Sequence, residues 1–164
     1  MIYIIFTLFL DLFLTFFISV SYQNINYFFP LIMVGSIPIF YSLLKNKKLF
    51  FLILLVTGIL YDTLFSDVFL VNTYYYLLFG FFVYIFYERH DIKLINIVLS
   101  SIIGVLLYDV FIFFTLILID YSVFSFYDLE YKLLRTFLLN FIYILFSIII
   151  FRSRIFGLKR CKKR

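Results

Sequence analysis

Long apolar runs separated by short polar gaps dominate this sequence of 164 residues. Crossing the hydrocarbon layer of a membrane takes about 20 mainly apolar residues per helix, so the chain has room for about six such helices and short connections. Hydrophobic residues make up 66% of the chain and the mean hydropathy is +1.15, which leaves too little polar surface to cover a soluble core. We therefore expect an integral membrane protein.

The runs have the length and pattern of membrane helices. Stretches such as 50–56 and 110–119 are largely apolar on every face, and this favours helices. The sequence thus predicts an all-α membrane protein, a bundle of about six transmembrane helices in a single domain, 1–164. The predicted spans are residues 2–20, 27–44, 49–66, 69–87, 93–119 and 130–151, followed by a basic cytoplasmic tail, 152–164.

Basic residues gather in alternate gaps between these spans. Twelve of the 14 Lys and Arg lie in the segments 45–48, 89–93 and 152–164, whereas the gaps 21–26, 62–69 and 120–130 contain none. The positive-inside rule places the basic segments, and with six spans both termini, in the cytoplasm of a multi-pass protein of the cell membrane. The net charge of +5 then reflects helix ends beside anionic lipid headgroups rather than a nucleic-acid surface.

Three carboxylates fall inside predicted spans: Asp11, Asp62 and Asp109. Such residues cost about 2.5–3.5 kcal/mol each on insertion scales, so they normally face the bundle interior and find partners. Asp62 and Asp109 are expected at similar depth, where Arg135 is within reach of either. Such a pair would fix helix packing or, alternatively, belong to a proton, ion or substrate pathway. Asp11 has no basic residue at matching depth and is expected to be protonated or bonded to Ser, Thr or Asn of neighbouring helices.

Two segments of the chain are alike. Gly58 is followed shortly by Leu60-Tyr61-Asp62, and Gly104 is followed shortly by Leu107-Tyr108-Asp109. Each Gly allows a neighbouring helix to approach closely, and each Tyr supplies a hydroxyl at the level of the carboxylate. The similarity is either an internal repeat or a coincidence in a Tyr-rich chain.

No catalytic constellation emerges from the sequence. His90 is the single histidine, Cys161 the single cysteine, and there are five glycines. These residues provide neither a multi-histidine metal site, nor a histidine-based triad, nor a glycine-rich phosphate loop. We expect no enzyme, no metal and no cofactor.

The order of segments is similar to that of a known family. Phe29-Pro30-Leu31-Ile32 opens the second predicted span, a basic turn follows, and the third span ends in Thr57-Gly58-Ile59-Leu60-Tyr61-Asp62-Thr63-Leu64-Phe65. In these features and in length the chain resembles MreD, the rod shape-determining membrane proteins, whose third span ends in a Gly-Leu-Leu-Tyr-Asp-like stretch. The Gly-, Tyr- and Leu-rich fourth span of that family corresponds to residues 72–80. Gly58, Tyr61 and Asp62 match the motif of the family.

The resemblance implies a non-enzymatic scaffold of the bacterial cell-elongation complex, which couples the cytoskeleton to peptidoglycan synthesis. Its implied partners are MreC and, through MreC, the actin-like MreB, the glycosyltransferase RodA and a penicillin-binding transpeptidase. That family is itself similar to the substrate-binding subunits of energy-coupling-factor vitamin transporters, so such a subunit is the alternative expectation. The absence of Ala, which those subunits use for helix docking, favours the scaffold.

Overall fold

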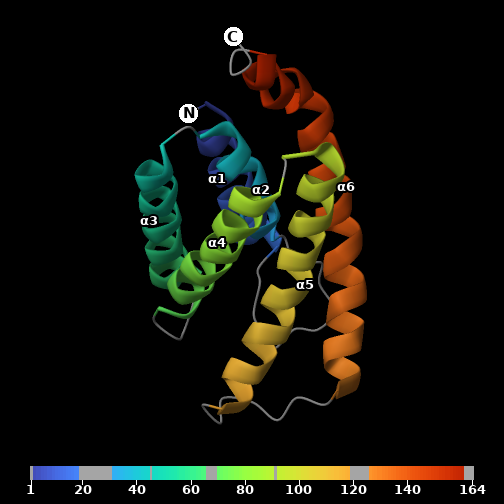
Figure 1. Cartoon of the computed structure of the whole chain (residues 1–164). Helices are drawn as coiled ribbons and strands as arrows, with labels where there is room; N and C mark the ends of the chain where they lie inside the picture. Colours follow the sequence, from blue (N-terminus) through green and yellow to red (C-terminus); the bar gives the residue numbers. More distant parts are fainter. Residues whose placement is uncertain are drawn as a thin grey trace.

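Helices account for nearly all of the described chain. The computed structural model describes residues 2–18, 31–44, 46–65, 70–90, 92–118 and 126–160. These residues form α1 (Ile2–Ile18), α2 (Ile32–Leu43), α3 (Lys47–Phe65), α4 (Val71–Arg89), α5 (Leu94–Leu118) and α6 (Phe126–Arg160), and no strand occurs in those ranges (Figure 1). The predicted all-α class with six helices is confirmed.

The helix ends differ from the predicted spans mainly at α2 and α6. The described part of α2 begins at Ile32, whereas residues 19–30, where its span was expected to start, lie outside the described part of the chain. The sixth helix runs for 35 residues, from Phe126 to Arg160, rather than from 130 to 151. It extends beyond the apolar run at both ends because neither flank contains Pro, and charged residues such as Glu, Lys and Arg are good helix formers.

The short helix α2 lies at the centre of the bundle. It packs against each of the other five helices. Every residue from Ile32 to Phe40 is buried, and most of these residues are apolar. A helix that is apolar on all sides is stable only when neighbours surround it, so the other helices form a shell around α2.

Helices α3 and α4 form a closely packed antiparallel hairpin. A Cβ atom added at Gly58 would lie 2.5 Å from Cα of Thr73, a distance that real Cβ atoms do not adopt. The backbones of the two helices therefore approach closely at this point, and only glycine leaves enough room.

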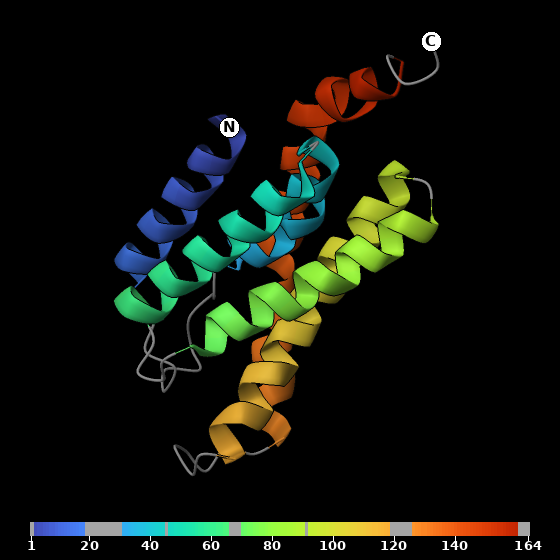
Figure 2. The ribbon, with the colours of Figure 1, turned by 60° about the vertical axis from the view of Figure 1, so that its left-hand side comes forward.

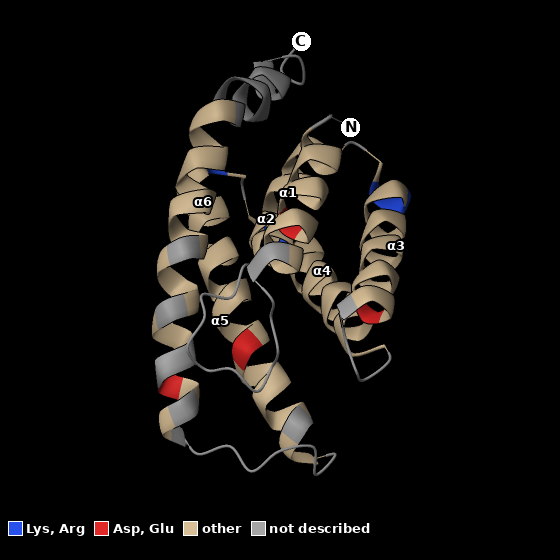
Figure 3. Cartoon of the chain, turned by 180° about the vertical axis from the view of Figure 1, so that it is seen from behind, with Lys and Arg blue, Asp and Glu red and all other residues tan. Residues whose placement is uncertain are grey.

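The helix ends that border the basic segments lie on one side of the molecule. In Figures 1 and 2, the end of α2, the start of α3, the end of α4, the start of α5 and the end of α6 all lie toward the upper end. Figure 3 shows blue Lys and Arg ribbon at the start of α3, near the N-terminus, while red Asp and Glu ribbon lies lower in the bundle. The described helices thus place the alternate gaps at opposite ends.

Judged by length and apolar character alone, one described segment, Leu94–Thr115 of α5, is sufficient to cross a membrane. Three apolar segments are shorter, namely Tyr3–Phe16, Ile32–Leu43 and Thr136–Ile150.

Replacing Gly58 by Ala is expected to lower the free energy of unfolding by about 1–3 kcal/mol, the usual effect of overpacking, because the new methyl group meets backbone that cannot rotate away. Gly35→Ala is the matched control. Its Cβ would approach the flexible end of Ile144, at 3.2 Å, so the cost is smaller. Thermal unfolding of both purified variants in detergent measures the difference, and an equal effect would contradict the close approach at Gly58.

Candidate functional site

Polar side chains gather inside the bundle. Within the described ranges, the buried polar residues come from all six helices and are no more than 7% exposed: Thr7, Asp11, Thr15, Ser36, Thr57, Asp62, Asn72, Thr73, Ser101, Asp109, Thr136, Asn140 and Ser147. Most of the hydrogen bonds that these residues make join different helices or helix starts. They form two centres, which we call the Asp11 cap and the Asp62 cap.

The Asp11 cap holds the first turn of α2. The two carboxylate oxygens of Asp11, on α1, accept hydrogen bonds from the backbone N–H groups of Ile32 (3.2 Å) and Met33 (3.1 Å). The hydroxyl of Tyr61, on α3, donates a further hydrogen bond to the same carboxylate. The first N–H groups of any helix lack partners within it, and a carboxylate satisfies them while also complementing the positive end of the helix dipole.

Asn140, on α6, completes this cap. Its side-chain oxygen accepts a hydrogen bond from the N–H of Leu31 at 2.9 Å. The amide nitrogen of Asn140 donates to the carbonyl of Thr136 at 2.8 Å, which fixes the orientation of the amide. Three consecutive N–H groups at the start of α2 are therefore bound by α1 and α6.

A line of hydroxyl groups continues from the Asp11 cap along α1. Tyr3 donates to Ser36 at 3.4 Å, and Thr7 shares a 3.0 Å hydrogen bond with Tyr143 of α6. Ser36 in turn lies 3.4 Å from the Tyr143 hydroxyl. On α1, Tyr3, Thr7 and Asp11 recur every fourth position, which places them on one face, and their partners come from α2, α3 and α6.

The Asp62 cap holds the first turn of α4. The carboxylate of Asp62, on α3, accepts hydrogen bonds from the backbone N–H groups of Asn72 and Thr73, both at 2.9 Å. It also accepts bonds from the Asn72 side-chain amide (3.0 Å) and the Thr73 hydroxyl (2.6 Å). Asp62 is 2% exposed, so its four hydrogen bonds replace the water that burial removes.

The two caps share one plan. In each, an Asp binds the first turn of the next helix along the chain, and a Tyr from a later helix completes the network. Tyr61 donates to Asp11, and Tyr108 donates to the Asn72 side chain at 2.5 Å. Both tyrosines belong to the similar Gly…Leu-Tyr-Asp segments, but Tyr61 donates to the capping carboxylate, whereas Tyr108 donates to the amide oxygen of Asn72. The internal repeat therefore stays a prediction.

The second glycine of the pair, Gly104, lies under an aromatic ring. A Cβ atom added there would lie 2.3 Å from Cζ of Phe79, and the carbonyl of Gly104 accepts a hydrogen bond from the Tyr75 hydroxyl at 2.5 Å. Gly104 of α5 therefore leaves room for two side chains of α4, whereas Gly58 of α3 leaves room for the backbone of α4.

Asp109 lies on α5 and is completely buried. The side chain of Arg135, its expected partner, lies outside the described part of the structure. The pairing of Arg135 with Asp62 or Asp109 therefore stays a prediction.

Sequence reasoning selected Asp11 and Asp62 but missed what they bind. For Asp11, Ser, Thr or Asn side chains were expected, and the described partners are two backbone N–H groups and Tyr61. The reason is that α2 begins inside the bundle, and this is not visible in the hydropathy pattern. Asn140 was missed as well, although a signal exists: Thr136, Asn140, Tyr143 and Ser147 recur at helical spacing within an apolar run.

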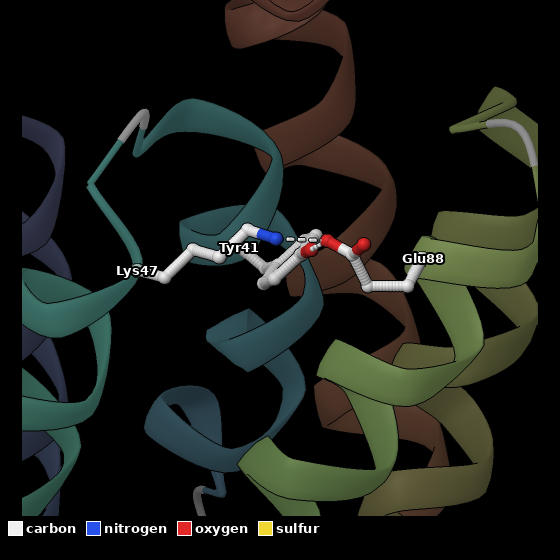
Figure 4. A network of polar contacts seen from close by, with 3 residues as sticks. All are labelled: Tyr41, Lys47 and Glu88. Carbon is white, nitrogen blue, oxygen red and sulfur yellow. Dashed lines mark hydrogen bonds and ion pairs between the residues drawn. The ribbon is translucent and has the colours of Figure 1, made fainter.

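A separate polar cluster lies at the end of the bundle where α2 ends and α3 begins (Figure 4). Lys47 forms an ion pair with Glu88 of α4, and its ammonium lies 4.7 Å from the centre of the Tyr84 ring. The Tyr41 hydroxyl donates to Glu88 at 3.4 Å. The hydrogen bond to Glu88 raises the pKa of Lys47, so the ammonium is charged at neutral pH, and its contribution to the ion pair is lost as the pH rises through that pKa. Because both side chains are nearly half exposed, its effect on stability is small.

The chemistry of these centres is that of helix capping. Among the described residues no group of three or more His, Cys, Asp or Glu could hold a metal ion. The acceptors of Asp11 and Asp62 are occupied by N–H and O–H donors of the chain itself. The fold and its caps therefore define a class: an all-α bundle in which buried carboxylates bind the starts of two helices.

No protein-family model matches the chain, and no curated protein or solved structure matches it either.

Replacing Asp11 by Ala is expected to lower the free energy of unfolding by about 3 kcal/mol or more, because three buried donors lose their acceptor at about 1–3 kcal/mol each. Asp11→Asn retains one acceptor oxygen and should lie between Ala and the wild type. Thr136→Val is the control, since its buried hydroxyl has no hydrogen-bond partner among the described residues and its loss should be nearly neutral. Unfolding of the three variants in detergent gives the order, and equal stability of Asp11→Ala and Thr136→Val would refute the cap.

Proposed function

We propose that the chain is an integral membrane protein and that its bundle is embedded in a lipid bilayer. The observation that carries this proposal is that polar side chains are buried inside the bundle, whereas many large apolar side chains are exposed on its outside. Large apolar residues are exposed on five helices, with Phe9, Phe16, Leu64, Tyr74, Ile95 and Ile142 each between 59% and 75% exposed. Soluble monomers rarely expose contiguous apolar surface on this scale, whereas lipid chains cover it at no cost.

The lengths of the helices support a bilayer. Helices α3 and α4 each contain 19 residues, which corresponds to about 28 Å at about 1.5 Å per residue, close to the roughly 30 Å of a hydrocarbon core. Helix α2, with 12 residues, is too short to cross. In a membrane a helix may begin at depth only where protein supplies partners for its N–H groups, and the Asp11 cap supplies them.

We further propose that this membrane bundle is a non-enzymatic scaffold of the bacterial cell-elongation complex that binds MreC and, through MreC, contributes to a complex with MreB, RodA and a penicillin-binding transpeptidase. Two features support a scaffold. The segment 57–65 resembles the corresponding motif of MreD, and within it Asp62 and Gly58 fix the α3–α4 hairpin. The polar groups of both caps are used to join helices, which leaves apolar outer faces as the surface for a partner's transmembrane helix.

Insertion into the membrane can be tested directly. The expressed chain should remain with membranes after extraction at alkaline pH, because its apolar outer faces stay in lipid. Cys161, the single cysteine, should react with a membrane-impermeant maleimide only after the cytoplasmic side is opened. Release of the chain by alkali would contradict the membrane proposal, and labelling of intact cells would contradict the topology.

The partner can be tested by affinity purification from gently solubilised membranes, with mass spectrometry of the recovered proteins. We expect MreC and elongation enzymes with the wild type and a loss of recovery with Asp62→Leu, which inserts more readily but loses the α4 cap. Thr63→Leu is the matched control, since that residue is exposed and its neighbour carries the cap. Unchanged recovery with Asp62→Leu would remove Asp62 from the mechanism, and recovery of paired ATPases with their membrane coupler would favour the vitamin-transporter alternative.

A further inference from the structure

One end of the bundle is strongly basic. In the sequence, 12 of the 14 Lys and Arg fall in the segments 45–48, 88–93 and 152–164, together with only two of the nine acidic residues, Glu88 and Asp91. The described basic residues of the first two segments, Lys47, Lys48, Arg89 and Lys93, are all exposed. The end of α4 and the starts of α3 and α5, which carry or adjoin these residues, lie on the same side of the molecule as the end of α6 (Figures 1 and 2), so the basic segments gather at one end.

Helix α6 is longer than a bilayer requires. Its 35 residues correspond to about 52 Å at about 1.5 Å per residue, against about 30 Å for the hydrocarbon core. The apolar part, Thr136–Ile150, is followed by Arg152 and Arg154 while the helix continues to Arg160. Figures 1 and 2 both show that the last turns leave the axis of the preceding part. These turns therefore lie beyond the apolar run and run in a different direction from it.

The spacing of residues in the last turns is that of an amphipathic helix. Phe151, Ile155 and Leu158 recur at i, i+4 and i+7, and thus occupy one face of the backbone. Four basic residues, Arg152, Arg154, Lys159 and Arg160, lie off this face, where Phe156 is the one large apolar residue, and the sequence after Glu130 contains no Asp or Glu. Basic amphipathic helices of this kind lie in the plane of the membrane interface, with the apolar face toward the acyl chains.

From these observations we propose that the last turns of α6, together with the exposed basic turns beside them, bind the headgroups of anionic phospholipids in the adjacent leaflet. The proposal rests on the membrane embedding proposed above and adds the chemistry of the lipid: phosphate-bearing headgroups with a net negative charge. Charge complementarity selects this ligand over neutral lipid, because each Lys or Arg near an anionic surface favours the bound state by about fivefold.

Cys161, the single cysteine of the 164 residues, allows a label to be placed at the end of α6 without any substitution. A nitroxide spin label on Cys161 reports, by electron paramagnetic resonance, whether the end of α6 is immobilised at the membrane. The labelled protein is reconstituted in vesicles of phosphatidylcholine alone and in vesicles that also contain phosphatidylglycerol. We expect an immobilised, membrane-associated label only with phosphatidylglycerol, and release of the label at about 1 M salt, where the Debye length falls to about 3 Å.

Substitutions that each remove one positive charge test which basic residues bind the headgroups. Lys159→Gln should lower the ratio of bound to free label by about fivefold, and the further change Arg160→Gln by about fivefold again. Lys132→Gln, at the opposite end of the same helix, should leave the ratio unchanged. A label that is equally mobile in the two kinds of vesicle, or equal effects of Lys159→Gln and Lys132→Gln, would overturn the headgroup proposal. Failure of the chain to stay with alkali-washed vesicles would instead overturn the membrane embedding on which it rests.

Discussion

The hydrogen bonds between Asp11 and the start of α2 are the interaction on which the bundle depends. Helix α2 touches every other helix, and its first N–H groups lie where no solvent reaches them. Without acceptors these groups would oppose burial by several kcal/mol, since an unsatisfied buried donor costs about 1–3 kcal/mol. One carboxylate from α1 and one amide from α6 remove that penalty, and they fix the depth at which α2 begins.

The same solution appears again at the start of α4. Asp62 binds the N–H groups and side chains of the first turn of α4, and Tyr108 joins this centre to α5. Tyr61 joins α3 to the Asp11 cap, and α3 also carries Asp62, so the two centres share this helix. In a bilayer, where apolar contacts between helices gain little over contacts with lipid, such polar links and close approaches at glycine are the interactions that specify packing.

The sequence was sufficient for the number and type of helices and for selecting the buried Asp residues, because both depend on hydropathy and on the cost of burying charge. It was not sufficient for the partners of those residues. The Asp11 cap requires knowing that α2 starts inside the bundle, and the hydropathy pattern there predicts a full-length span from 27 to 44 instead. Asn140 contributes to this cap through a contact 109 residues away in sequence, which depends on the packing of α6 rather than on any local motif.

The measurement that tests the account most directly is a carbon–nitrogen distance experiment by solid-state NMR on the protein in lipid bilayers. The chain contains two methionines, and Met33 is the one with a backbone amide inside a helix. Labelling Asp side-chain carboxyls with ¹³C and Met amides with ¹⁵N therefore isolates the contact of Met33 with Asp11, whose oxygen lies 3.1 Å from that nitrogen. We predict strong dipolar dephasing in the wild type and its loss in Asp11→Ala. A wild-type protein in bilayers that shows no dephasing would contradict the central claim that a carboxylate of α1 holds the start of α2.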